Sequence, residues 1–174
     1  ALRADGALDV VAELKVSVCL MHMQGQPRTM QEAPHYDDVV GEVHRFLAER
    51  IFAAEMAGIA RKRIVVDPGF GFGKTLQHNL QLLAQLQRFT ELGVPVLAGL
   101  SRKKSRGEIT GREDPRERIA GSVAAHLIAA QRGAMLLRVH DVAATADALK
   151  VWNAVAAVPP PRIEAKPAIA WPED

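Results

Sequence analysis

The fold of this chain is decided by Ile64-Val65-Val66-Asp67-Pro68-Gly69-Phe70-Gly71-Phe72-Gly73-Lys74-Thr75. A short apolar run ends in a carboxylate and is broken by Pro68-Gly69, which are turn residues. An apolar pattern of helical spacing then runs from about Leu76 to Leu92, with Gly93 behind it. A strand, a glycine-rich loop and a helix in this order form the repeating unit of a parallel α/β fold.

The same unit occurs three more times along the chain. The other apolar runs are residues 16–22, 94–100 and 134–140, and the helical patterns are residues 37–56, 115–132 and 142–156. Strands that are apolar on both faces predict a parallel sheet covered on both faces. Residues 6–14 resemble the end of a preceding helix. We expect one domain over residues 1–157 and a proline-rich, irregular tail over residues 158–174.

Length and composition exclude several classes of protein. The chain has 174 residues, of which 48% are apolar, and a formal net charge of +2, so no nucleic-acid partner is predicted. It has no apolar run near the roughly 20 residues of a membrane span and no signal peptide, and its one cysteine, Cys19, favours a reducing compartment; a cytoplasmic location is expected. The chain is shorter than the roughly 250 residues of an eightfold α/β barrel, and it starts at Ala1, so we expect further chain upstream.

Short groups of residues, most of them with polar side chains, lie at the C-terminal ends of the four predicted strands. They are Met21-His22, Asp67, Ser101-Arg102-Lys103 and Arg138-Val139-His140. Ligands of parallel α/β folds bind at this carboxyl edge of the sheet. Here Asp67 can accept paired hydrogen bonds from an amidine-like edge of a heterocycle, and a cation from the basic run can donate to a ring carbonyl or nitrogen. Ser101 can help an anion to sit at the start of the next helix.

Arg138 and His140 stand two residues apart. On a strand they point to the same face, where the pair suits a polyphosphate leaving group. The alternative is a strand end that is salt-bridged to Asp141. For the basic run of residues 101–106, the alternative is a solvated loop.

The glycine-rich stretch superficially resembles a phosphate-binding loop. Its spacing argues against one, because Gly69 and Gly73 enclose three residues instead of four and Pro68 lacks an N–H. Cys19 is predicted to be a small buried hydrophobic residue. His22 has no second His or Cys at ligand spacing, so no protein-only metal site is predicted.

Four motifs together resemble dihydropteroate synthase. They are Leu20-Met21-His22-Met23-Gln24-Gly25, the string from Asp67 to Lys74, Ser101-Arg102-Lys103, and Arg138-Val139-His140-Asp141-Val142. The resemblance extends over about residues 6–157. It implies a (β/α)8 TIM barrel, of which this chain corresponds to the last four βα units. The implied reaction joins p-aminobenzoate to a dihydropterin diphosphate and releases pyrophosphate.

The resemblance also implies roles for individual residues. Asp67 would bind the ring N–H and amino group of the pterin, and Lys103 its O4 and N5 edge. Arg138 would lie against the ring and, with His140, face the diphosphate. The implied catalytic residues are Lys103, Arg138 and His140, and the implied substrate-binding set adds Met21, Asp67, Phe70, Gly71, Ser101 and Arg102.

Two departures from the family affect the expected activity. Lys104 stands where many members have a serine that holds the p-aminobenzoate carboxylate, and Lys104 or Ser105 could replace it. The family's Mg²⁺ ligand and mobile loops belong to its first four strands, so the chain alone is expected to be weak or inactive. A homodimer is also implied. The alternatives are a pterin-binding module without catalysis and a phosphate- or nucleotide-binding domain that uses residues 69–75.

Overall fold

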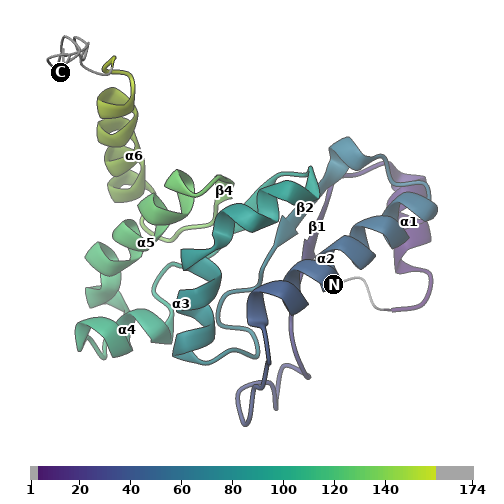
Figure 1. Ribbon diagram of the computed structural model, residues 1–174, viewed down its shortest axis with the longest axis horizontal. Helices are drawn as coiled ribbons and strands as arrows, with labels where there is room; N and C mark the ends of the chain where they lie inside the picture. Colours follow the sequence, from purple (N-terminus) through teal and green to yellow (C-terminus); the bar gives the residue numbers. More distant parts are fainter. Residues whose placement is uncertain (1–3, 160–174) are drawn as a thin grey trace, which may run out of the picture.

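The computed structural model describes residues 4–159 (Figure 1). In chain order the elements are α1 (Ala7–Leu14), β1 (Val18–Met21), α2 (Val39–Met56), η1 (Arg61–Arg63), β2 (Ile64–Asp67), α3 (Leu76–Ala84), η2 (Leu86–Leu92), β3 (Val96–Ala98), α4 (Lys104–Thr110), η3 (Pro115–Arg118), α5 (Ile119–Gln131), β4 (Ala134–Leu137) and α6 (Val142–Ala156). All four predicted βα units are present.

The four strands form one parallel sheet in the order β1-β2-β3-β4. Met21 pairs with Asp67 at the ends of β1 and β2, and Ala98 pairs with Leu137 at the ends of β3 and β4. Because the strands are parallel and in sequential order, the loops that follow them leave the sheet at the same edge. This edge carries the polar motifs.

Among the described residues, helices cover one face of the sheet. The core on that face joins Leu20, Val66 and Val96 of the strands to Leu47 of α2 and Phe89 of η2. The predicted cover on both faces is wrong for residues 4–159, because right-handed crossovers between strands in sequential order place the connecting helices on the same side. The other face includes Cys19 and Met135, of which Met135 is 75% exposed. The prediction of a buried Cys19 is therefore also wrong.

The helix boundaries differ from the prediction where local packing overrides the apolar pattern. The expected helix of residues 76–92 divides into α3 and the 3₁₀ segment η2, whose buried residues Leu86, Phe89 and Leu92 repeat every three residues, the period of a 3₁₀ helix. Residues 115–132 begin as η3, with Asp114 capping the turn and Pro115 as its first residue. The second half of the basic run, for which a loop was an alternative, forms the start of α4, while residues 101–103 precede the helix.

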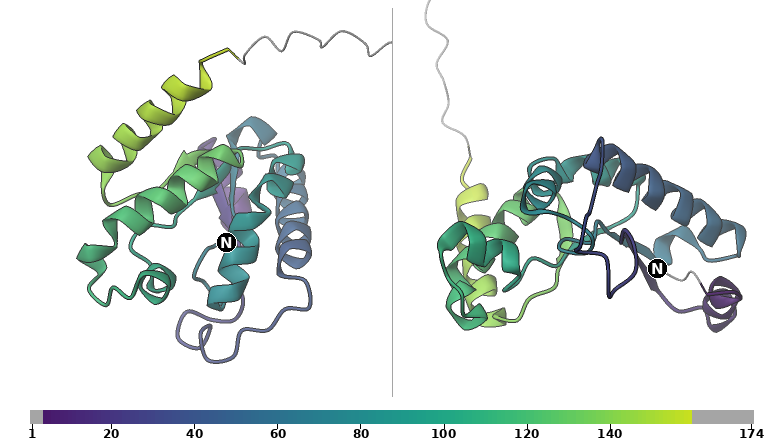
Figure 2. Two further views of the ribbon diagram at one scale, coloured as in Figure 1. Left: turned by 60° about the vertical axis from the view of Figure 1, so that its left-hand side comes forward. Right: turned by 90° about the horizontal axis from the view of Figure 1, so that it is seen from below.

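The last helix, α6, has the predicted limits and packs along α5, while its end projects away from the rest of the molecule (Figure 2). The predicted tail, residues 158–174, lies outside the described residues from position 160 onward. No helix within residues 4–159 has the length and apolarity needed to cross a membrane.

Candidate active site

Asp67 lies at the centre of the carboxyl edge. Its side chain is buried, and its Oδ1 accepts a hydrogen bond of 2.7 Å from the backbone N–H of Gly69. Burial raises the pKa of Asp67, while the Gly69 N–H and the positive charges of Lys103, Arg138 and Lys74 act in the opposite direction. The edge therefore brings together one buried carboxylate and three cations from separate loops.

The glycine-rich loop approaches the neighbouring backbone closely. Gly69 has φ +73°, and a Cβ there would overlap the carbonyl oxygen of His22. Further along, the N–H of Gly71 donates to Oδ1 of Asn79 at 2.7 Å. Helix α3 begins directly after the loop because Thr75 and His78 cap it reciprocally. The loop is thus fixed at both ends, with Phe70 buried beneath it.

Lys74 is buried inside this loop. Its Nζ lies 2.9 Å from Nδ1 of His22 and donates to the carbonyl oxygens of Gly69 and Phe72, both at 3.0 Å. The side chain is 4% exposed. These contacts occupy the three donors of an ammonium group, so Lys74 ties the loops after β1 and β2 together and is not presented to a phosphate. The interpretation of residues 69–75 as a phosphate-binding loop is not supported.

The burial of Lys74 predicts a specific pH dependence of stability. Burial lowers the pKa of Lys74 from 10.5 to about 7, since the nearby Asp67 only partly offsets the cost of the buried charge and Lys103 adds to it. Between pH 7 and 9 the unfolded chain keeps the proton that the folded chain releases, so stability rises with pH. We expect a gain of about 2 kcal/mol over this range in the free energy of unfolding by urea, and no such gain in Lys74→Met. Parallel curves for the two proteins would contradict this.

Lys103 follows β3 and turns back toward the glycine-rich loop. Its Nζ donates to the carbonyl oxygen of Phe70 and lies 4.3 Å from the ring centre of Phe72. A Cβ on Gly71 would meet Cδ of Lys103 at 3.0 Å, so the glycine leaves room for the Lys103 side chain. Lys103 lines both cavities described below.

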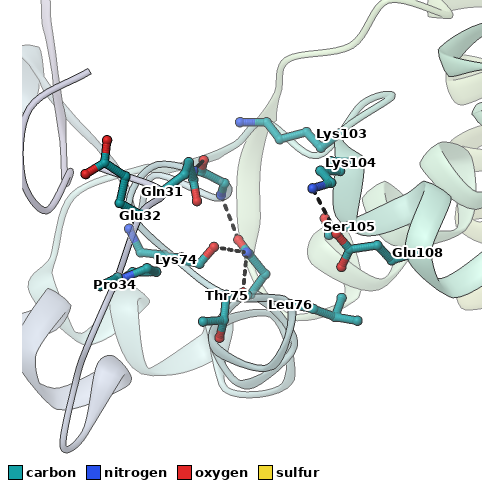
Figure 3. Close-up of a pocket in the computed structure, with 13 residues that line it drawn as sticks. Gln31, Glu32, Pro34, Lys74, Thr75, Leu76, Lys103, Lys104, Ser105 and Glu108 are labelled. Carbon is teal, nitrogen blue, oxygen red and sulfur yellow. Dashed lines mark hydrogen bonds and ion pairs between the residues drawn. The ribbon is translucent and has the colours of Figure 1, made fainter. Parts of the chain in front are cut away.

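The larger cavity, of about 670 Å³, lies between the loop after β1, the start of α3 and α4 (Figure 3). Gln31, Glu32 and Pro34 stand on one side of it, and Lys103, Lys104, Ser105 and Glu108 stand on the other. Lys104 is exposed, and its ion pair with Glu108 is long, at 3.9 Å.

The smaller cavity, of about 200 Å³, is lined by Gly99, Ser101, Lys103, Arg138, Val139 and His140. Strand β4 ends at Leu137, so the same-face rule for a strand does not apply to Arg138 and His140, yet both line this cavity. Arg138 lies over Gly99, where a Cβ would approach its Nε to 3.2 Å. Oγ of Ser101 lies 2.9 Å from Nδ1 of His140, which orients the ring and leaves Nε2 as the nitrogen that can meet a ligand.

Asp141 forms an ion pair with Arg102. Their two hydrogen bonds measure 3.1 and 2.5 Å, so the alternative of a strand end of Arg138 and His140 that is salt-bridged to Asp141 is wrong. Arg102 lines neither of the two cavities at this edge.

Whether the chain can hold a metal ion depends on how its possible ligand side chains are grouped. Within residues 4–159, no group of three His, Cys, Asp or Glu side chains comes close enough to hold a metal ion. The described residues therefore do not by themselves fit a Mg²⁺ site.

Fold and site together define an α/β protein of the (β/α)8 barrel class with two cavities at the carboxyl edge of its strands. The family model described as "Pterin binding enzyme" matches residues 2–140, and the chain belongs to this family. Dihydropteroate synthase of Escherichia coli (strain K12) is 51% identical over 153 residues, which are 88% of this chain and 54% of that protein.

The chain is also similar to solved structures of dihydropteroate synthases. Dihydropteroate synthase of Xanthomonas albilineans with 4-aminobenzoic acid is 72% identical with a TM-score of 0.86, and the match covers 91% of this chain and 56% of that one. The same enzyme in complex with 7,8-dihydropteroate is 71% identical with a TM-score of 0.85, covering 91% and 57%. The resemblance to dihydropteroate synthase and the predicted fold class, four βα units of a (β/α)8 barrel, are confirmed. The chain spans slightly more than half the length of these relatives.

Sequence reasoning named the residues that line this edge but missed the ones that shape it. The sequence indicates no contact between Lys74 and His22, which appear there as the end of a glycine-rich motif and as a strand-end residue. Asn79, 2% exposed, was not singled out, although a polar amide in the first turn after the Thr75 cap is a usable signal. Nothing in the spacing of Lys74 indicates that its ammonium turns inward.

Proposed function

We propose that this chain forms the pterin and diphosphate side of a dihydropteroate synthase active site. The proposed reaction joins a dihydropterin diphosphate to p-aminobenzoate and releases pyrophosphate. The observation that carries the proposal is the convergence of Asp67, Lys103 and Arg138, from three separate motifs, at one edge of the sheet. Its support from relatives is the pair of Xanthomonas albilineans structures, with 4-aminobenzoic acid and with 7,8-dihydropteroate.

In this proposal the pterin ring lies between Asp67 and Lys103. The carboxylate of Asp67 accepts from the ring N–H and the amino group, and Lys103 donates to O4 and N5. Met21, level with Asp67 on the adjacent strand, forms one wall of the pocket, and Phe70 and Gly71 border the ring. The guanidinium of Arg138 lies against the ring.

The smaller cavity is proposed to hold the diphosphate. Arg138 and His140 supply positive charge and donors there, and Ser101 orients the imidazole. The bond between the pterin methylene carbon and the diphosphate oxygen breaks with its electron pair on pyrophosphate, and the arylamine nitrogen bonds to that carbon and loses a proton. Stabilising the departing charge is the main catalytic demand, so no general base is required of these residues.

The larger cavity is proposed to admit the arylamine. It shares Lys103 with the smaller cavity, which places the two proposed substrates on either side of one cation. Lys104 or Ser105, at the start of α4, would hold the carboxylate in place of the family's serine. The proposal also includes a homodimer, a cytoplasmic location and the family's use of Mg²⁺.

Calorimetric titration tests the proposal. The 174-residue chain is titrated with 6-hydroxymethyl-7,8-dihydropterin in the presence of inorganic pyrophosphate, and with ATP as the competing chemistry. We expect a saturable heat with the pterin and none with ATP. No pterin heat would reject the proposal, and ATP binding that is lost in Lys74→Ala would favour a nucleotide-binding domain instead.

Turnover distinguishes catalysis from binding alone. We expect pyrophosphate release by the 174-residue chain, followed in steady state, to be very slow beside that of a full-length relative, because the chain spans 54% of the Escherichia coli enzyme. Release at the relative's rate would contradict this. Pterin binding without detectable release, even at high enzyme concentration, would assign the chain to the non-catalytic pterin-binding alternative.

A further inference from the structure

Helix α5 and the residue just before it carry a row of buried polar side chains that faces the loop after β3. Arg118, Ser122 and His126 stand four residues apart and are 9%, 2% and 0% exposed. Four-residue spacing places side chains above one another on a single face of a helix. Buried polar groups require partners, and here backbone groups are among them.

The row binds the backbone of residues 100–102. The N–H of Leu100 donates to Nε2 of His126 at 3.2 Å, and the N–H of Arg102 donates to Oγ of Ser122 at 2.9 Å. Nη1 of Arg118 donates to the carbonyl oxygen of Arg102 at 3.1 Å. Both backbone groups of Arg102 are therefore held by this row, the N–H by Ser122 of α5 and the carbonyl oxygen by Arg118 at the end of η3.

The row is itself internally bonded, which fixes the direction of each contact. Oγ of Ser122 donates to the carbonyl oxygen of Arg118 at 2.6 Å, so its lone pairs remain for Arg102. Nδ1 of His126 lies 2.7 Å from the carbonyl oxygen of Ser122, which makes Nδ1 the donor and Nε2 the acceptor. Nε of Arg118 also donates to the carbonyl oxygen of Arg112 at 2.9 Å, beyond the end of α4.

Backbone strain marks the same point. Arg102 has φ +55°, and Lys15 is the other non-glycine residue with positive φ within residues 4–159. A left-handed conformation is costly for such a side chain and persists where surrounding contacts over-determine it. At Arg102 these contacts are Ser122, Arg118 and the ion pair with Asp141.

The hold on the backbone of Leu100 and Arg102 affects the residues that alternate with them, Ser101 and Lys103. Leu100 and Arg102 turn their backbone groups to α5, whereas the side chain of Ser101 meets His140 and that of Lys103 meets the carbonyl of Phe70. If Arg102 relaxed to an ordinary conformation, the chain would leave the loop in another direction and Lys103 would be re-aimed. The row thus acts on the site through the backbone.

We propose that Arg118, Ser122 and His126 are positioning residues that hold Arg102 in its left-handed conformation and so aim Ser101 and Lys103 into the site. This inference rests on the proposed function only for its effect on ligand binding. Its structural part, the hold on the loop, is independent of any ligand.

The first test is amide hydrogen exchange in Ser122→Ala. We expect the amide of Arg102 to exchange about tenfold faster or more, the order expected for loss of one buried hydrogen bond, while the amide of Val66 in β2 is unchanged. Thr90→Ala is the matched control, since it removes a 2.6 Å hydroxyl contact to the carbonyl of Gln87 away from this loop. Unchanged exchange at Arg102 would overturn the proposal, whether or not the chain binds a pterin.

The second test asks whether Ser122 acts through Lys103. Pterin affinity is measured by calorimetry for Ser122→Ala, Lys103→Met and the double variant, with Ser122→Thr as the conservative replacement. We expect Ser122→Ala to weaken binding about tenfold in the native background, to have almost no effect beside Lys103→Met, and to be largely rescued by threonine. Additive effects would overturn the proposed route. Absence of pterin binding by the native chain would reject the proposed function and leave the exchange experiment to decide the inference.

Discussion

Replacing Asp67 by asparagine is expected to weaken pterin binding by about 100-fold or more. A carboxylate can accept two charge-assisted hydrogen bonds from adjacent ring and amino N–H groups, each worth about 1.5–3 kcal/mol. Asparagine offers one acceptor and turns its NH₂ donor toward a donor of the ligand. Calorimetric titration with 6-hydroxymethyl-7,8-dihydropterin measures the loss.

The same substitution should not cost stability, which separates a binding role from a structural one. Burial raises the pKa of Asp67, so its contribution to stability is present at low pH and lost as the pH rises through the folded pKa. Asparagine removes that buried charge and keeps an acceptor for the Gly69 N–H. We expect an equal or higher Tm at pH 7. Glu32→Gln, at the exposed wall of the larger cavity, is the control for loss of a carboxylate. Equal pterin affinity in Asp67→Asn and the native chain would contradict the assignment of Asp67.

Replacing Gly69 by alanine is expected to destabilise the fold by more than about 3 kcal/mol, measured by urea unfolding. The left-handed φ of +73° alone costs an alanine about 1–2 kcal/mol. In addition, the new Cβ would overlap the carbonyl oxygen of His22, a backbone atom that cannot swing aside. The two loops that Lys74 ties together would have to separate.

Two other glycines supply controls for this experiment. Gly111 has φ +68° and nothing within 4 Å of the Cβ position, so Gly111→Ala should cost only the conformational part, about 1 kcal/mol. Gly71 has φ +77° and faces the flexible side chain of Lys103, so Gly71→Ala should resemble Gly111→Ala in stability and yet weaken pterin binding. Equal destabilisation by Gly69→Ala and Gly111→Ala would show that the approach to His22 is not limiting.

Much of the architecture could be predicted because it depends on local patterns. Apolar runs that alternate with helical periodicity identified the four βα units, and Val142–Ala156 was delimited correctly. Ligands of parallel α/β folds bind at the carboxyl edge of the strands, and this rule predicted that Asp67, Lys103, Arg138 and His140 lie together. The loops after parallel, sequential strands do leave the sheet at one edge. The division of residues 76–92 was missed because its cause is a three-residue burial repeat set by the neighbouring sheet.

By itself, the sequence determined the number and order of the βα units, the position of the glycine-rich loop and the identity of the side chains at the carboxyl edge. These follow from chain order, from continuous apolar runs and from the helical period of 3.6 residues, which are properties of neighbouring positions. Only the tertiary structure decided that the ammonium of Lys74 turns inward, that Asp141 pairs with Arg102, and that α5 holds the loop of Lys103. Each of these depends on which of several nearby polar groups finds a partner once water is excluded, and packing of distant segments alone settles that choice.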